Sequence, residues 1–408
     1  MLLLSHLISI LTQFVAVRHT ANTLLLLDGV SANVVAERTG HSTTRMTPYK
    51  IGAFLSGDGV LEPQTLTCEV NAARKGRRAK KQEVLNCMPK AVQLSAYGGV
   101  DQLGIVDVAK PEPDAGEVVV RVVAAGTNPG EISIREGLLR DVFPMDFPFG
   151  QGADFAGRID SVGAGVTGFA PGEEVLGWTE QRAAQAEYVA SSASRLIPKP
   201  PALDWFRAGS LFVVATTAVA AVRAVSLKSG DVVAVSGAAG GVGSLAVQLA
   251  RRAGARVIGI ASDENAEFLR SVGVEPVAYG DGLTERLQEL APKGLGAFID
   301  LFGGGYVELA VTLGVPSERI DTIIDFPAAQ KYGAKTDGSS AAASRDTLAS
   351  VANLLAWGEI VMPLTAIYPF VSLRDAYAEL ASRRARGKIV LAFDATITEP
   401  LRPPKPTA

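Results

Sequence analysis

The chain has 408 residues, of which 48% are hydrophobic and 20% are charged, and its formal net charge is -3. A chain of this length and composition can bury a large core and is expected to form two or three domains. It has no overall basic field to attract nucleic acid and no acidic excess of the kind that keeps chains disordered.

Cysteine and histidine are confined to the first part of the chain. The two cysteines stand at positions 68 and 87, and the three histidines stand at positions 6, 19 and 41. From residue 88 onward the chain therefore lacks the ligands of a Cys/His zinc site, the imidazole of a histidine acid/base system and any structural disulfide. We predict no metal site there.

The opening segment, residues 1–17, is apolar but has no positively charged start and no clear cleavage site. It is also shorter than the roughly 20 residues of a membrane span. We interpret it as neither signal nor anchor, so no membrane partner is expected and the cytoplasm is the default location.

Two short helix patterns follow, at residues 20–27 and 32–38, around the turn Asp28-Gly29. Together with Arg18-His19-Thr20 and Gly40-His41-Ser42, they make residues 15–49 resemble the C-terminal end of a phage-type tyrosine recombinase. The resemblance implies that Arg18 and His41 match phosphate-binding positions. Val15 stands where that family has a histidine, and Tyr49 comes too early for the nucleophile, so DNA cleavage is not expected.

A basic run at residues 74–81 has no apolar face and reads as a solvated linker, with a nucleic-acid or nuclear-import patch as the alternative. Met88-Pro89-Lys90 then looks like an ordinary enzyme N-terminus. Our hypothesis is that translation starts at Met88 and that residues 1–87 are a non-native or disordered extension carrying a decayed recombinase fragment. The intact mass of the native protein tests this, and a product beginning at Met1 would contradict it.

After Met88 the pattern is that of short β-strands with turn residues between them. Strands are predicted at residues 90–94, 103–107, 117–124, 156–162, 174–178 and 186–189. They indicate a β-rich, partly closed domain, and the prolines at positions 198, 200 and 201 mark its junction with the next part of the chain.

That next part alternates strands and helices, which is the sequence form of a parallel, doubly wound sheet. Strands are predicted at residues 231–236, 256–261, 276–279, 297–302, 319–325 and 389–393, and helices at residues 242–252, 263–272 and 373–383. The fold class is therefore α/β.

The first strand of this part leads into the turn GAAGGVG, residues 237–243. Glycine permits a tight reversal from strand to helix and lets the backbone approach a pyrophosphate at the positive helix N-terminus. Structural glycines in an ordinary turn are the alternative. The strand before, the helix after and the second strand–helix unit favour dinucleotide binding.

The end of the second strand predicts which dinucleotide is bound. An NAD site usually has Asp or Glu there to hold the ribose hydroxyls, whereas this strand ends Ala261-Ser262, with Asp263 one place later. Small hydroxyl and amide groups, Ser262 and Asn265, leave room for a 2′-phosphate, so NADP is favoured. Ser262 and Asp263 could instead simply cap the next helix.

Several blocks in order resemble the quinone oxidoreductase branch of the medium-chain dehydrogenases/reductases. They are AAGTNP (124–129), GADFAG (152–157), GAGV (163–166), PGEEV (171–175), the glycine turn and RGKIVL (386–391). The resemblance implies a GroES-like catalytic domain interrupted by a Rossmann domain. The implied domains are residues 88–204 with 357–394 (GroES-like) and residues 205–356 (Rossmann, NADP-binding), with a tail at 395–408.

The resemblance also implies hydride transfer from NADPH to a small-molecule quinone or α,β-unsaturated carbonyl without zinc, in a chain that can form a homodimer. An enoyl-thioester reductase is a second enzyme reading, and a catalytically inactive NADPH-binding protein is a reading of another class. Cofactor binding without NADPH consumption would favour the last.

The predicted cofactor-binding residues are Asn128, Thr217, Ala239, Gly240, Gly241, Val242, Gly243, Ser262, Asn265, Tyr279 and Lys388. The resemblance places the first two near the nicotinamide, the turn under the pyrophosphate, the next three around the adenosine phosphate and the last near the cofactor.

For four of these positions the sequence alone also allows a purely structural role. Asn128 could be a turn residue, Thr217 a hydroxyl bonding its own helix, Tyr279 a strand aromatic and Lys388 a surface charge. No catalytic acid is named, because Leu138-Leu139 replaces the tyrosine that many relatives carry near this position. Glu131 is read as organising the domain, and solvent is the expected proton source.

Overall fold

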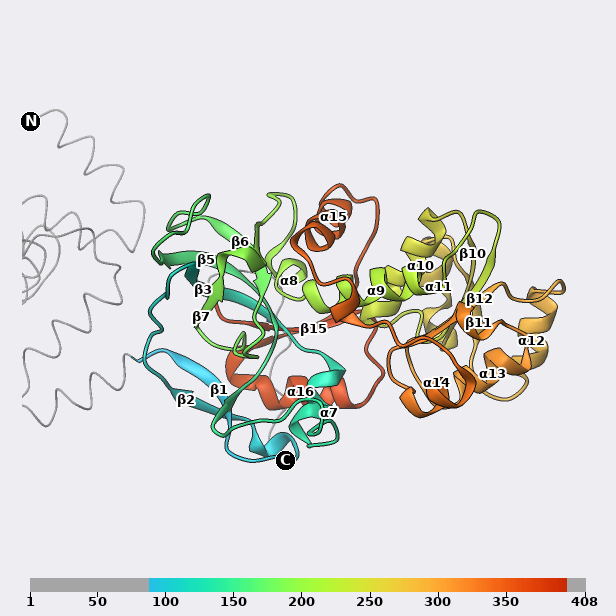
Figure 1. Cartoon of the computed structure of the whole chain (residues 1–408), viewed down its shortest axis with the longest axis horizontal. Coiled ribbons are helices and arrows are strands. Elements are labelled where there is room, and N and C mark those ends of the chain that lie inside the picture. The colour runs from blue at the N-terminus through green and yellow to red at the C-terminus, as the bar shows by residue number, and fades with distance from the viewer. Residues whose placement is uncertain (1–87, 395–408) are drawn as a thin grey trace, which may run out of the picture. The chain divides into compact units, whose positions relative to one another are not determined.

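We describe residues 88–394 in a computed structural model of the chain (Figure 1). Residues 89–394 belong to a single compact unit. The predicted N-terminal extension, its recombinase-like positions and the tail at 395–408 lie outside the described residues.

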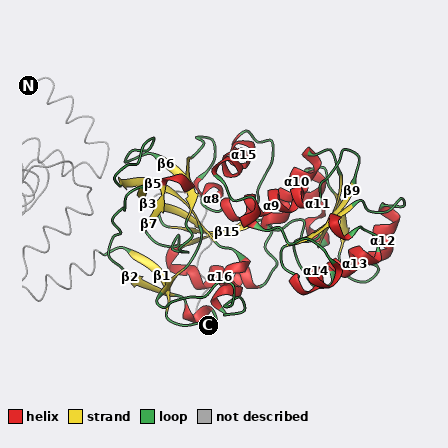
Figure 2. Ribbon diagram, in the orientation of Figure 1, coloured by secondary structure: helices red, strands yellow, loops and turns green. Residues whose placement is uncertain are grey.

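The first of two large sheets has seven strands, most of them antiparallel (Figure 2). Its path is β14-β15-β3-β5-β6-β8, with β7 paired to β3. The strands are β3 (Glu117–Gly126), β5 (Asp154–Val162), β6 (Glu174–Trp178), β7 (Tyr188–Ser192), β8 (Leu196–Pro198), β14 (Leu364–Pro369) and β15 (Lys388–Ala392). A small sheet beside it, in the order β2-β1-β4, comprises β1 (Lys90–Leu94), β2 (Gly104–Asp107) and β4 (Phe149–Gly150).

The long strand β3 organises this sheet because it pairs with β5, β7 and β15. Its run of valines and alanines is buried, which is the pattern of a strand covered on both faces. The pairing of β15 with β3 brings residues near the C-terminal end of the chain against residues 124–126.

The second sheet has five parallel strands in the order β11-β10-β9-β12-β13. They are β9 (Val232–Val235), β10 (Arg256–Ala261), β11 (Glu275–Ala278), β12 (Ala297–Asp300) and β13 (Ile320–Thr322). The order reverses at β9, and the carboxyl ends of strands at such a point are where doubly wound sheets bind ligands.

Helices cover both faces of the parallel sheet (Figure 1). On one face α9 (Phe212–Ala224), α10 (Gly241–Arg252) and α11 (Ala266–Ser271) pack on side chains such as Val233 and Ile299. On the other, α12 (Leu283–Leu290), α13 (Tyr306–Thr312) and α14 (Phe326–Tyr332) pack on Ile258 and Phe298. The remaining helices are α7 (Pro129–Arg135), α8 (Trp205–Ala208), α15 (Arg345–Ala356) and α16 (Leu373–Ala381).

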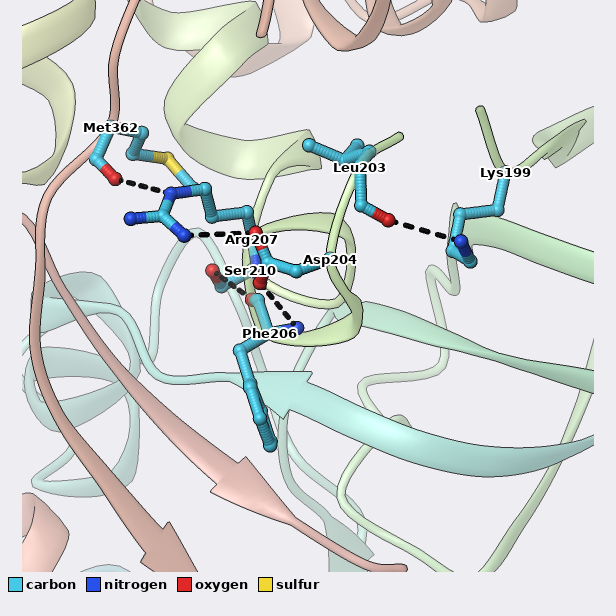
Figure 3. Close-up of polar contacts among 7 residues, drawn as sticks. All are labelled: Lys199, Leu203, Asp204, Phe206, Arg207, Ser210 and Met362. Carbon is cyan, nitrogen blue, oxygen red and sulfur yellow. Dashed lines mark hydrogen bonds and ion pairs between the residues drawn. The ribbon is translucent and has the colours of Figure 1, made fainter. Parts of the chain in front are cut away.

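The chain passes between the two large sheets twice, and Arg207 of α8 connects the two passages (Figure 3). Its Nε donates to the carbonyl of Met362 at 2.9 Å, and its Nη1 donates to Asp204 Oδ2 at 2.9 Å. Asp204 also caps α8 by accepting from the backbone N–H of Arg207. Close by, Gln248 of α10 exchanges two hydrogen bonds with the backbone of Val361.

The predicted α/β organisation and most of the predicted elements are confirmed, three strands with the same bounds. The continuous helix expected at residues 263–272 is wrong, because Asp263–Asn265 forms a 3-10 turn before α11 begins. The strand expected at 186–189 begins at Tyr188 instead. The domain boundaries near residues 204 and 357 stay a prediction. No helix among residues 88–394 is long and apolar enough to cross a membrane.

Candidate cofactor and active site

The glycine-rich turn connects the carboxyl end of β9 to α10, whose N-cap is Gly240. A Cβ added at Gly243 would lie 2.1 Å from the carbonyl oxygen of Gly237, so only glycine fits there. The first turn of α10 thus rests directly on the backbone that precedes it. This close approach leaves the helix N-terminus as a backbone cradle suited to a pyrophosphate.

The start of β15 lies against this turn. The backbone N–H of Gly387 donates to the carbonyl of Ala239 at 2.9 Å, and Gly387 forms a parallel bridge with Gly240. Gly387 has a φ of 77°, and a Cβ there would lie 1.9 Å from the carbonyl oxygen of Pro363. The motif Arg386-Gly387-Lys388 is therefore part of the same local structure as the glycine turn.

Lys388 connects the turn to Asn128. Its side chain lies beside Gly241, where an added Cβ would be 3.1 Å from Lys388 Cδ. Its Nζ donates to the carbonyl of Thr127 at 2.6 Å and to Asn128 Oδ1 at 2.7 Å. Lys388 is only 3% exposed, so its expected alternative as a surface charge is wrong.

Asn128 is the centre of a buried network of charges. Its Nδ2 donates to Asp154 Oδ2 at 2.9 Å and to Glu131 Oε1 at 3.2 Å, while its Oδ1 accepts from Lys388. Both amide hydrogens are thereby used within the protein. Asn128 is also the N-cap of α7, directly before Pro129. The alternative that it is a turn residue before Pro129 is compatible with this position.

Tyr377 of α16 joins this network through its hydroxyl group. Its hydroxyl donates to Glu131 and accepts from Gln151 Nε2 at 3.0 Å and from Gln185 Nε2 at 2.7 Å. Asp154 is held from the other side, where its Oδ1 accepts from the backbone N–H of Val213 at the start of α9. Glu131 thus joins α7 to α16, in agreement with its interpretation as a charge that organises the domain.

Burial dominates the electrostatics of this network. Loss of hydration raises the pKa of Glu131 and the pKa of Asp154, and the positive charge of Lys388 lowers both again in part. Burial lowers the pKa of Lys388, against the opposing effect of the two carboxylates. Burial also raises the pKa of Tyr377 well above its usual value. One cation therefore compensates two buried acids.

Thr217 lies on α9, the helix that contacts both Asp154 and the glycine turn. It is 5% exposed, and its hydroxyl donates to the carbonyl of Val213 at 2.6 Å. This bond matches the alternative that the Thr217 hydroxyl bonds the backbone of its own helix. A role beside the nicotinamide stays a prediction.

The residues predicted to bind the adenosine end gather at the carboxyl ends of β10 and β11. Asn265 Nδ2 donates to Ser262 Oγ at 2.8 Å, and Ser262 begins the 3-10 turn. The backbone N–H of Tyr279 donates to the carbonyl of Ala261, and its side chain is 59% exposed. These three residues therefore form one surface, whereas Asn128 and Lys388 form a separate, buried group.

Several residues of the site were not predicted from the sequence. Asp154 lies within the block GADFAG, which carries the resemblance but no local pattern for a buried carboxylate. Tyr377 lies on α16, whose helical pattern does not predict its long-range contacts. Asp300 is a third case: its carboxylate accepts from Ser236, from Thr322 and from the backbone after β12. It joins the carboxyl ends of three neighbouring strands beside the glycine turn.

Two family models match the chain. Residues 114–201 match the alcohol dehydrogenase GroES-like domain, and residues 241–320 match the zinc-binding dehydrogenase model. Within residues 88–394 no group of three or more His, Cys, Asp or Glu side chains is arranged to hold a metal ion.

Curated relatives include a chloroplastic quinone-oxidoreductase homolog of Spinacia oleracea, 33% identical over 46% of this chain and 60% of the relative. The quinone oxidoreductase of Rattus norvegicus is 34% identical over 44% of this chain and 55% of the relative. The matched regions thus span little more than half of these two proteins. An NADPH-dependent alkenal/one oxidoreductase of Arabidopsis thaliana is 26% identical over 86% of this chain and 92% of the relative.

The solved structure of a quinone oxidoreductase from Coxiella burnetii superposes with a TM-score of 0.67 and 27% identity, over 75% of this chain and 99% of that one. The two sheets therefore form a GroES-like domain and a Rossmann domain. In both domains the chain is similar to quinone oxidoreductase-like members of the medium-chain dehydrogenase/reductase family.

Proposed function

We propose that this protein is an NADPH-dependent oxidoreductase that transfers a hydride to a quinone or an α,β-unsaturated carbonyl without zinc. The observation that carries the proposal is the glycine cradle, in which the Gly243 position leaves no room for a side chain against Gly237. The names of the spinach, rat and Arabidopsis relatives support the acceptor class.

The residues present fit a dinucleotide. Ala239 to Gly243 would hold the pyrophosphate at the start of α10, and Lys388 would lie beside it because its side chain packs on Gly241. When bound, NADPH would supply the hydride. Asn128, whose amide is fully used, would act by fixing Lys388 rather than by touching the cofactor.

The surface formed by Ser262, Asn265 and Tyr279 supports NADPH over NADH. It offers hydroxyl and amide groups near the end of β10, and the first acidic side chain, Asp263, comes one residue later and is exposed. A 2′-phosphate can accept from such donors, whereas a carboxylate at this position would repel it.

The residues present do not fit a catalytic zinc. Residues 88–394 contain neither cysteine nor histidine, although one matching family model is named for zinc. We therefore propose that the protein's own groups orient and polarise the acceptor, and that water supplies the proton. The expected cytoplasmic location and homodimer stay predictions.

The full-length protein tests this proposal when it is mixed with NADPH or NADH and a panel of quinones, enones and enoyl thioesters. We expect NADPH-preferring oxidation with a quinone or an enone. Turnover confined to enoyl thioesters would support the alternative enzyme. Tight NADPH binding with no turnover on any acceptor would identify an inactive cofactor-binding protein.

Ser262→Asp tests the cofactor preference separately. The new carboxylate would repel a 2′-phosphate and could hold the ribose hydroxyls of NADH, so we expect the KM for NADPH to rise about 10-fold or more while the KM for NADH falls. Asp263→Ser is the matched control, which should leave the NADPH preference intact. Loss of NADH use in that control would instead assign the ribose contact to Asp263.

A further inference from the structure

Arg182 stands in a backbone conformation that non-glycine residues rarely adopt. It follows β6 in the connection to β7, and its φ is 52°. Its carbonyl oxygen lies 2.7 Å from where a Cβ at Gly150 would be, so the neighbouring segment is fitted to this arrangement. Such conformations cost free energy and persist where the surrounding structure holds them, often at functional sites.

The side chain of Arg182 is half-buried and lacks the partners that guanidinium groups usually have. No hydrogen bond or ion pair of this side chain exists among residues 88–394. Its guanidinium packs instead over Phe143, whose ring centroid lies 4.6 Å from the guanidinium carbon. By contrast, the half-buried Arg319 is paired with Asp231 at 2.6 Å. Five donor hydrogens on Arg182 are thus available to a ligand.

The segment that carries this guanidinium is bonded to residues of the buried network. Burial lowers the pKa of Arg182, and the negative charge of Glu131 raises it, so Glu131 is near enough for its charge to act there. The backbone of Gln185, three residues on, is bonded to Gln151, and both glutamines donate to Tyr377. Contacts therefore continue from the glycine turn through Lys388 and the network to the segment that carries Arg182.

Phe143 lies in a segment with an unusually apolar surface. Leu138 and Val142 are 72% and 68% exposed, and the rings of Phe143 and Phe147 are 40% and 36% exposed. Phe147 is held edge-on against Tyr97, with ring centroids 5.1 Å apart. A cation over one of these rings makes a surface with an apolar body and a strong hydrogen-bond donor.

We propose that Arg182 and Phe143 form the acceptor-recognition site, where the ring contacts a planar conjugated carbonyl compound and the guanidinium donates to its carbonyl oxygen. The inference rests on the proposed function and adds the residues that select the acceptor. In the reduction, a C–H bond of NADPH would break as its hydride forms a C–H bond at the β-carbon of the acceptor. The C=C and C=O π electrons would shift to give an enolate, whose oxygen carries the negative charge. That oxygen then takes a proton from water, while Arg182 stays protonated throughout and stabilises the developing negative charge.

Arg182→Asn is the sharpest test because asparagine tolerates the left-handed conformation, while the guanidinium and its contact with Phe143 are removed. We expect kcat/KM for the acceptor to fall about 10- to 100-fold, the range of one hydrogen bond to a charged group. The KM for NADPH should stay within about twofold of wild type, because the glycine cradle is untouched. Arg140→Asn is the matched control: Arg140 is an exposed cation of the same apolar segment and should leave acceptor kinetics unchanged.

A calorimetric titration with 1,4-naphthoquinone, without NADPH, separates this inference from the proposed function. Naphthoquinone binding that weakens in Arg182→Asn and not in Arg140→Asn supports the site even if no NADPH is consumed. Equal losses in both variants would indicate a general charge effect and overturn it. NADPH oxidation and quinone binding that are both unchanged in Arg182→Asn would overturn it while leaving the oxidoreductase intact.

Discussion

The glycine turn and the buried network around Asn128 meet at Lys388, yet they are held together by different forces. The turn is made of backbone atoms from one short segment, fitted so closely that a Cβ at Gly243 would overlap Gly237. The network is made of charged and polar side chains from β5, α7, α16 and β15. The turn should therefore respond to added volume, and the network to changes in charge and pH.

Lys388→Met should produce the largest effect, because it removes the buried cation whose charge lowers the pKa values of both Glu131 and Asp154. Removing one partner of a buried charged group costs about 3–5 kcal/mol of folding stability. The pKa values of both acids are already raised, so their contribution to stability is present at low pH and is lost as the pH rises. Urea unfolding should show a larger loss at pH 8 than at pH 5.

Lys110→Met is the control for this variant. Lys110 also contacts a carboxylate, Asp160 Oδ1 at 2.7 Å, but on the surface, where such a pair contributes about 1 kcal/mol or less. Similar losses in the two variants, or a loss in Lys388→Met that does not depend on pH, would contradict the electrostatic account of the network.

Asp321 on β13 tests whether a buried carboxylate also lowers folding stability within the parallel sheet. Its Oδ1 accepts from the backbone N–H of Asp337 at 2.8 Å, and its Oδ2 is buried without a hydrogen-bond partner among residues 88–394. Burial raises its pKa to about 7. Because the unfolded carboxyl ionises near pH 4, wild-type stability should fall between about pH 4 and pH 7.

Asp321→Asn removes the ionisable group and keeps one acceptor. It should be more stable than wild type at pH 8 by on the order of 3 kcal/mol and similar to it at pH 4, when measured by urea unfolding at both values. Asp160→Asn, at a partly exposed carboxylate, supplies the comparison. A stability difference that is the same at both pH values would mean that Asp321 is ionised in the folded protein across this range.

Gly243→Ala tests whether the glycine turn is sensitive to added side-chain volume. The new Cβ would lie 2.1 Å from a backbone oxygen that cannot rotate away, so the turn must shift. Overpacking of this kind costs about 1–3 kcal/mol, more than the roughly 1 kcal/mol that alanine returns in a helix. We expect a lower Tm and weaker NADPH binding, measured by thermal unfolding and by fluorescence titration.

Gly240→Ala is the matched substitution in the same turn, with its nearest atom 3.3 Å away. It should leave the Tm nearly unchanged, whatever it does to cofactor binding. If both variants unfold alike, the close approach at Gly243 is not what makes the turn sensitive.

The same contrast explains what the sequence could predict. The glycine turn with its flanking strand and helix is a local pattern, so the strand–turn–helix unit at residues 231–252 could be predicted from the sequence. The roles of Ser262 and Asn265 come from the family resemblance, with helix capping as the alternative. The hydrogen bond from Tyr377 to Glu131 joins residues 246 positions apart, and no local pattern carries it. Lys388 reads as an ordinary surface charge until β15 is placed beside β3 and its ammonium is enclosed by Thr127 and Asn128.

Of the four variants, Arg207→Met should change folding stability least, although Arg207 connects the two chain segments that run between the sheets. The side chain is 37% exposed, so its ion pair with Asp204 is screened by water, and the bond to the Met362 carbonyl can be replaced by solvent. We expect about 1 kcal/mol of lost stability in urea unfolding, with no dependence on pH between 5 and 8. Lys90→Met, which removes an exposed pair within one sheet, should cost less. If Arg207→Met lost more than about 3 kcal/mol of folding stability, the two connecting segments would contribute more to stability than expected from an exposed ion pair.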